Sequence, residues 1–155
     1  MIEFALVAPV FFFLLFAIIE TGTIFLAQSD LQNAVNYSAR IVQTGQVKSQ
    51  NMTSQQFRTA VCNQLRMLHC GSELRINLES YASFSGASYS PPLNADGTPN
   101  SNANKFSPGI SGQVVMLQAS YTWPIATPLL TPFLRNMAGN YHLIVATAAF
   151  RNEPF

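Results

Sequence analysis

The chain has 155 residues, of which 48% are hydrophobic and 10% are charged, and its net charge is +1. This length suits one modest domain, and the low charge excludes wholesale disorder, because disordered chains have the opposite bias. The basic residues are scattered along the chain, so the sequence gives no electrostatic reason to expect a nucleic-acid partner.

The first element is an apolar run without charge from Phe4 to Ile19, which resumes after Glu20 and continues to Ala27. A helix over residues 4–27 would be about 36 Å long, enough to cross a hydrocarbon core of about 30 Å. The run therefore predicts a membrane-spanning helix.

Two other interpretations of the run compete with a membrane anchor. A secretory signal peptide opens with Lys or Arg, whereas this chain opens Met1-Ile2-Glu3. A buried core helix would need a larger partner domain than the remaining residues supply. We therefore interpret residues 1–27 as the transmembrane or filament-core half of a long helix, and residues 28–155 as a head.

Three residues of this segment need an explanation. Pro9 predicts a kink, or a weak point at which the helix unravels during assembly. Glu20 falls near the far interface, where we expect its carboxylate to reach headgroups or water; the alternative is a buried functional carboxylate. Glu3 favours a helix N-terminus, or it pairs with the N-terminal amine of a neighbouring copy and sets axial register.

The helix is expected to continue beyond the membrane. Residues 28–48 are amphipathic, with apolar side chains at helical spacing, and Gly45 is a plausible stop, so one helix would extend from about Ile2 to Thr44. A second helix is predicted from Thr53 to Leu68, opened by a Thr-x-x-Gln capping box.

Three strands follow, over residues 74–81, 113–123 and 141–151. The first two alternate apolar and polar residues, whereas the third is apolar on both faces, which predicts a central strand or one covered by the helix. The long segments 83–112 and 124–140 predict no regular element. The expected fold class is α+β and pilin-like, with the long helix on a small antiparallel sheet.

The two cysteines, Cys62 and Cys70, are expected to form a disulfide, because a membrane anchor places the domain in an oxidising compartment. A metal site with His69 and His142 is the alternative, but the spacing does not fit a zinc site. No motif for a nucleophile, a metal-dependent hydrolase or a phosphate loop is present. The sequence therefore predicts neither a cofactor nor an enzyme.

Several short motifs together resemble the N-terminus and the end of TadE-like proteins, the pseudopilins or minor pilins of bacterial tight-adherence (Tad/Flp) pili. The apolar run alone is a weak signal, whereas the acid-Phe start, Glu3-Phe4, with the closing motif is fairly specific. The motifs are Glu3-Phe4-Ala5-Leu6-Val7-Ala8-Pro9, Ile18-Ile19-Glu20-Thr21-Gly22, Leu31-Gln32-Asn33-Ala34-Val35, the paired Cys62 and Cys70, Tyr121-Thr122-Trp123-Pro124 and Phe150-Arg151-Asn152-Glu153-Pro154-Phe155.

The resemblance implies a protein that is cut by a prepilin peptidase, held in the inner membrane with a periplasmic head, and assembled with other pilins. The implied partners, through helix 1–44, are the major Flp-type pilin, a TadF-like protein or further copies. The acid of the family lies five residues after the cut, whereas Glu3 is third, so the chain begins inside the mature form or is cut at an unusual place. A surface adhesin acting through residues 83–112, or a small membrane enzyme, are the alternative functions.

Overall fold

One long helix organises the molecule. In a computed structural model that describes residues 2–155, α1 extends from Ile2 to Gln43 as 42 residues of continuous helix, which confirms the predicted single helix. Gly45 follows with a φ of 74°, a left-handed conformation that glycine adopts without strain. A Cβ on Gly45 would overlap the ring of Phe155, so the ring as placed leaves no room for a side chain there.

Two shorter helices follow, α2 (Gln46–Ser49) and α3 (Ser54–Cys62). The predicted capping box opens α3: the Gln56 backbone N–H donates to Thr53 Oγ1 at 3.2 Å, and the Thr53 N–H donates to Gln56 Oε1 at 2.8 Å. These two bonds satisfy backbone donors that a helix start otherwise leaves unpaired.

The prediction that this second helix continues to Leu68 is wrong, and the reason is a tertiary contact. The Asp30 carboxylate on α1 accepts the backbone N–H groups of Arg66 at 3.0 Å, Met67 at 2.9 Å and Leu68 at 3.3 Å. An N–H that points at α1 cannot also bond within its own helix, so α3, which ends at Cys62, cannot continue through residues 66–68.

The sheet has three antiparallel strands, β1 (Leu74–Tyr81), β2 (Val114–Pro124) and β3 (Tyr141–Arg151), in the order β1-β2-β3. All three strands lie close to their predicted positions. The observed combination of a long helix, further helices and an antiparallel sheet confirms the α+β fold class.

The sequence predicted that the third strand is either central in the sheet or covered by the helix. The second alternative holds: β3 lies at the edge of the sheet, and α1 covers it. The Gln28 side-chain amide on α1 donates to the Val145 carbonyl at 2.9 Å, and that of Gln32 to the Thr147 carbonyl at 3.5 Å. These amides occupy carbonyls that an open sheet edge would offer to another chain. The apolar character of β3 therefore reflects contact with α1.

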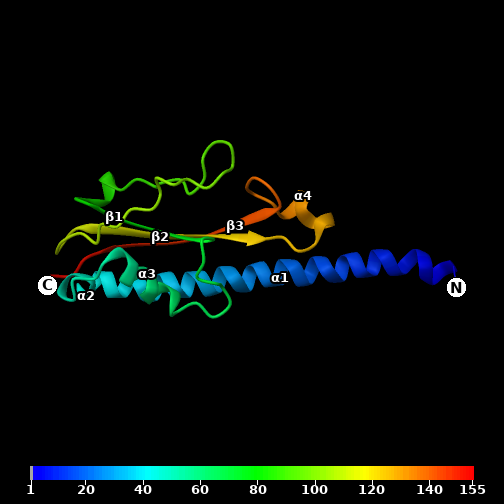
Figure 1. The fold of residues 1–155 in the computed structure, drawn as a ribbon, viewed down its shortest axis with the longest axis horizontal. Helices are drawn as coiled ribbons and strands as arrows, with labels where there is room; N and C mark the ends of the chain where they lie inside the picture. Colours follow the sequence, from blue (N-terminus) through cyan, green and yellow to red (C-terminus); the bar gives the residue numbers. More distant parts are fainter. Residues whose placement is uncertain (1) are drawn as a thin grey trace.

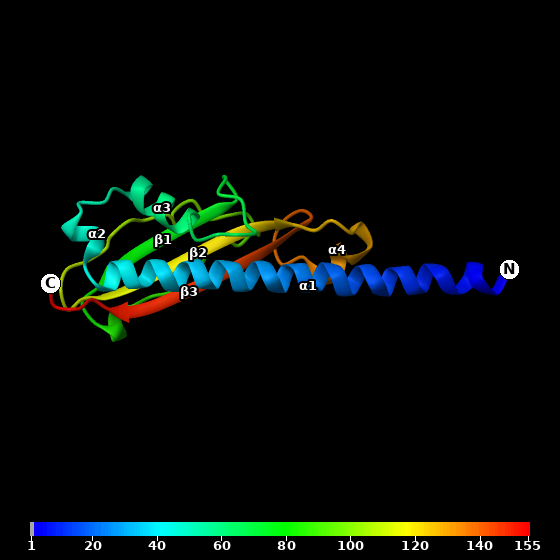
Figure 2. The same ribbon diagram turned by 90° about the horizontal axis from the view of Figure 1, so that it is seen from below.

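The head has three layers, with α1 on one face of the sheet and residues 83–112 across the other (Figures 1 and 2). The hydrophobic core lies between α1, α3 and the sheet. Its fully buried large side chains are Leu31, Val35, Val42, Phe57, Val61, Leu74, Leu78, Val115, Leu117 and Ile144.

The segment 83–112 contains one short 3-10 helix, η1 (Phe84–Gly86), and a stretch that pairs with the outer edge of β1. The Leu78 N–H donates to the Lys105 carbonyl at 2.9 Å, and the Ser107 N–H donates to the Leu78 carbonyl at 2.7 Å. Both edges of the sheet are thus partly covered, one by this segment and one by α1.

The second irregular stretch forms a lobe of two short helical turns, η2 (Pro128–Leu130) and α4 (Thr131–Leu134). In both views the lobe lies beside the N-terminal half of α1, away from the end of the head that carries α2 (Figures 1 and 2). The head therefore reaches further along the helix than the sheet alone.

Candidate functional site: the apolar half of the long helix and its contacts with the head

The N-terminal half of α1 projects from the head with apolar side chains exposed in every direction. The helix is long and apolar enough to cross a membrane, and only 6% of its most apolar window is buried in the protein. A core helix of a soluble protein would be mostly buried, so this exposure distinguishes the two cases. The exposed large side chains are Phe4, Leu6, Val7, Val10, Phe11, Phe12, Leu14, Leu15, Phe16, Ile18 and Ile19.

The predicted assembly residues Glu3, Phe4 and Pro9 all lie on this projecting part. Glu3 and Pro9 are exposed, and the Phe4 side chain is 75% exposed. The helix continues through Pro9 without a break. The N-terminal amine proposed as the partner of Glu3 lies outside the described residues, so the pairing stays a prediction.

Glu20 occupies a different environment from the rest of the projecting half. Its residue is only 7% exposed, and its carboxylate accepts the backbone N–H of Ala126 at 3.0 Å and that of Thr127 at 3.1 Å. The Thr127 hydroxyl donates a third hydrogen bond at 2.8 Å. Charge-assisted bonds of this kind are about twice as strong as neutral ones, so Glu20 ties the start of the lobe to α1.

The expectation that Glu20 reaches headgroups or water is therefore wrong. The sequence places Glu20 at an interface by counting residues along α1, but it cannot show that Ala126 and Thr127 fold back onto that level. The only hint lay in the absence of charged residues between Trp123 and Arg135, which is typical of a segment that packs on an apolar surface.

On the N-terminal side of Glu20, the lobe and α1 form an apolar groove between them. Pro9, Phe12, Phe13 and Phe16 line it from α1, and residues 127–129 line it from the lobe. The head therefore contacts the helix well before residue 27, where the sequence placed the boundary between membrane segment and head. That boundary stays a prediction.

Residues 1–40 match the model of a protein family described as TadE-like protein. This segment is similar to TadE-like proteins. The match covers the projecting half of α1 and most of its amphipathic continuation, and it confirms the resemblance for residues 1–40; the motifs at Cys62 and Cys70, at 121–124 and at 150–155 lie outside it. No curated protein and no solved structure matches the chain.

The closing motif, residues 150–155, lies against the end of α1. The Glu153 N–H donates to the Gln43 carbonyl at 3.0 Å, which satisfies one of the acceptors that a helix C-terminus leaves open. Asn152 is buried, and its side-chain amide donates to the Pro108 carbonyl at 2.9 Å. The motif thus connects the end of α1 to segment 83–112.

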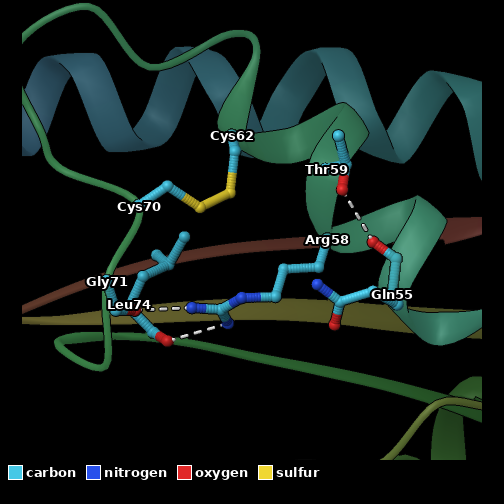
Figure 3. Close-up of a disulfide and its surroundings, with 7 residues drawn as sticks. All are labelled: Gln55, Arg58, Thr59, Cys62, Cys70, Gly71 and Leu74. Atoms are coloured by element: carbon cyan, nitrogen blue, oxygen red, sulfur yellow. Dashed lines mark hydrogen bonds between the residues drawn. A yellow bond between two sulfur atoms is a disulfide. The ribbon is translucent and has the colours of Figure 1, made fainter.

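Cys62 and Cys70 are joined in a disulfide that closes the segment after α3, with their Cα atoms 5.6 Å apart (Figure 3). Next to it, the Arg58 guanidinium donates to the carbonyls of Gly71 at 2.6 Å and Leu74 at 3.0 Å. The disulfide and Arg58 together hold the turn between α3 and β1. With both sulfur atoms bonded to each other, neither cysteine offers a thiolate to a metal or a substrate.

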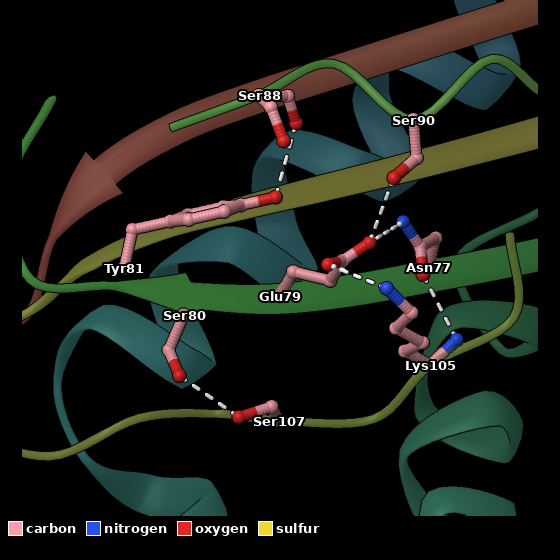
Figure 4. Close-up of polar contacts among 8 residues, drawn as sticks. All are labelled: Asn77, Glu79, Ser80, Tyr81, Ser88, Ser90, Lys105 and Ser107. Carbon is pink, nitrogen blue, oxygen red and sulfur yellow. Dashed lines mark hydrogen bonds and ion pairs between the residues drawn. The ribbon is translucent and has the colours of Figure 1, made fainter. Parts of the chain in front are cut away.

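A polar cluster holds segment 83–112 on the sheet (Figure 4). The Glu79 carboxylate on β1 accepts hydrogen bonds from Asn77 at 2.8 Å and Ser90 at 2.9 Å, and it forms an ion pair with Lys105 at 3.1 Å. The Lys105 backbone N–H donates to the Asn77 side chain at 2.8 Å. Two distant parts of the segment are therefore fastened to one strand.

The environment of Glu79 shifts its acidity. Partial burial raises the pKa of Glu79, but hydrogen bonds from Asn77, Lys105 and Ser90 and the charge of Lys105 outweigh it, so the pKa lies below its ordinary value. The charged form of Glu79 is thus the one that holds the segment in place.

Candidate chemistry is sparse in the part of the chain that the structure describes. Among residues 2–155, no group of three or more His, Cys, Asp or Glu side chains is placed to hold a metal ion. The best-defined polar site in this range is the contact between Glu20 and the lobe, which is structural in geometry.

Proposed function

We propose that this protein is a membrane-anchored structural subunit, a minor pilin or pseudopilin, of a Tad-type pilus. One observation carries the proposal: a single TadE-like helix whose apolar half projects unburied from the head, while its other half forms the spine of that head. A helix of this kind can be held first by lipid and later by other helices. The head would then lie in the periplasm, or outside the cell in an assembled pilus.

Assembly would transfer the projecting half of α1 from lipid into a bundle of similar helices. Lipid chains are as apolar as these side chains, so the hydrophobic effect does not drive the transfer, and packing and specific polar contacts must do so. Glu3 is the exposed acid at the start of this helix, and an unpaired charge in an apolar bundle is costly. Pairing with the amine of a neighbouring copy would fix the axial register.

The partners in this proposal are other pilin subunits, namely the major Flp-type pilin, a TadF-like protein or further copies, all contacted through helix 1–44. A prepilin peptidase would process the chain in the inner membrane. The exposed ring surface of Phe4, together with Pro9 and the apolar side chains between them, would supply the packing surface.

Glu3→Ala tests the electrostatic part of the proposal. We expect cells carrying this variant to lose pili, counted by electron microscopy, while the head remains folded. Glu153→Ala is the matched control, because Glu153 is an exposed acid at the other end of the molecule. Normal piliation in the Glu3→Ala variant would contradict the proposed charge pairing. Normal piliation in cells that lack this protein would contradict the proposed function itself.

An adhesin remains the second candidate, on one observation. Segment 83–112, whose backbone lies across the sheet from α1 (Figure 1), exposes two aromatic side chains, Phe84 at 62% and Tyr89 at 55%. Exposed aromatic rings are frequent in recognition surfaces. The two functions differ in one respect: an adhesin variant would leave cells with pili that do not attach, whereas a structural variant would remove the pili.

A further inference from the structure

The lobe of residues 124–134 exposes an uncharged, apolar surface. It contains no charged residue and three prolines, Pro124, Pro128 and Pro132. Leu129 is 69% exposed and Phe133 is 79% exposed. Single exposed apolar residues are ordinary, but two large ones on an uncharged lobe beside an apolar helix make the lobe an apolar patch that indicates an interaction surface.

The position of the lobe along α1 identifies what covers this patch. Leu129 lies in the groove formed with Pro9, Phe12 and Phe16. Phe12 is about 12 Å along the helix from Glu20, at roughly 1.5 Å per residue. The uncharged run from Phe4 to Ile19 is itself only about 24 Å long, less than a hydrocarbon core of about 30 Å. A membrane that surrounds this run therefore also surrounds Leu129.

Several backbone N–H groups of the lobe have partners within the protein. Hydrocarbon requires that backbone polar groups find partners within the protein. Glu20 accepts the N–H groups of Ala126 and Thr127, the Leu130 N–H bonds to the Thr127 carbonyl, and the Ile125 N–H bonds to the Asn140 carbonyl. The three prolines have no N–H to satisfy.

The residues that flank the lobe are those that favour a membrane interface. Trp123 precedes it, and Tyr141 and His142 begin β3 opposite the end of β2, where Trp123 pairs with His142 and Pro124 with Tyr141. Arg135 follows directly after α4. Aromatic side chains are enriched at the headgroup level, and long basic side chains reach it from below.

We propose that residues 124–134 are a second membrane contact, which inserts into the leaflet nearest the head with Leu129 and Phe133 among the lipid chains. The proposal rests on the membrane anchoring of α1. Glu20 then acts as an internal acceptor that lets a non-regular piece of backbone enter hydrocarbon beside the helix. Attachment at two points fixes the orientation of the head on the membrane, and extraction of the subunit into a filament must remove the lobe together with the helix.

Tryptophan fluorescence of the full-length chain in phosphatidylcholine vesicles tests the proposal. The chain has one tryptophan, so Trp123→Phe gives a silent background. In that background, Phe133→Trp reports on the lobe, Phe11→Trp on the helix, and Phe84→Trp on the far end of the head; all three positions carry exposed phenylalanine. Lipids brominated on their acyl chains quench only a tryptophan that touches them.

We expect Phe133→Trp and Phe11→Trp to lose most of their emission with brominated lipid, and Phe84→Trp to keep it and to be quenched by iodide in the water. If Phe11→Trp is quenched but Phe133→Trp is quenched only by iodide, the lobe lies in water and this proposal alone is overturned. If neither quencher reaches Phe133→Trp, another protein copy covers the patch, which also overturns it. If Phe11→Trp escapes the lipid, membrane anchoring and the lobe proposal both fail.

Discussion

The two halves of α1 are one continuous helix with opposite surroundings. Around Leu14 the helix is apolar on all sides, and Leu14 itself is 55% exposed. Around Leu31 it is apolar on one stripe only, and Leu31 is fully buried under the sheet. Small residues in the second half, such as Ala27 and Ala34, are fully buried and let the strands come close.

The difference shows that one continuous helix can be suited to two environments, a protein core on one half and an apolar surrounding on the other. A stripe of apolar side chains is enough where a sheet covers one face of the helix, whereas apolar side chains all round are needed where lipid or other helices surround it. Glu20 lies at the junction, where a polar group is retained because the lobe supplies three donors for it. The comparison predicts that the same substitution has different effects in the two halves.

The largest expected effect is on the stability of the head. Leu31→Ala should lower the free energy of unfolding by about 2–5 kcal/mol, because it leaves a cavity in the core. Leu14→Ala, the matched change in the projecting half, should stay within about 0.5 kcal/mol. Urea denaturation of both variants in detergent, followed by circular dichroism, measures this. Equal losses would mean that the projecting half also supports the head.

A smaller effect is expected at the junction. Glu20→Ala removes the acceptor of two backbone N–H groups, but the lobe can open and expose both to solvent, so the total loss should stay below the cost of a single buried unpaired group, about 1–3 kcal/mol. Hydrogen exchange at the Ala126 and Thr127 amides should become faster, while the amides of β2 stay protected. Glu3→Ala, which removes an exposed acid from the same helix, is the control and should leave hydrogen exchange at the Ala126 and Thr127 amides unchanged. Unchanged exchange at Ala126 would show that the lobe is held by its apolar contacts alone.

The smallest effect is expected in the polar layer on the other face of the sheet. The pKa of Glu79 is lower in the folded protein than its ordinary value of about 4.5, so its contacts are complete above that pH and are lost as the pH falls through the folded-state pKa. The exposed position of Lys105 limits the contribution to about 0.2–1 kcal/mol.

Proteolysis of segment 83–112 at falling pH measures this loosening. Glu79→Gln should remove the acid-dependent step, since a glutamine side chain does not titrate in this range. A step that persists in Glu79→Gln would assign the loosening to a different carboxylate.

Much of the architecture could be predicted because it follows from local patterns. The strand limits follow from alternation and from Pro124, the start of α3 from the Thr53 capping box, and the end of α1 from Gly45. The environment of Glu20 could not be predicted, since its partners lie more than a hundred residues away, at separations of 106 and 107. The early end of α3 was missed for the same reason, because Asp30 acts from another helix.

The sequence by itself determined a long helix with two surfaces, because hydrophobic periodicity is a property of neighbouring residues and changes from all-round to one-sided after Ala27. Only the tertiary structure decided how far the head extends along that helix. A contact such as that of Glu20 with Thr127 depends on how the chain folds back after β2. The uncharged run of residues 124–134 can be interpreted only once the structure shows that part of it lies beside Phe12 and Phe16.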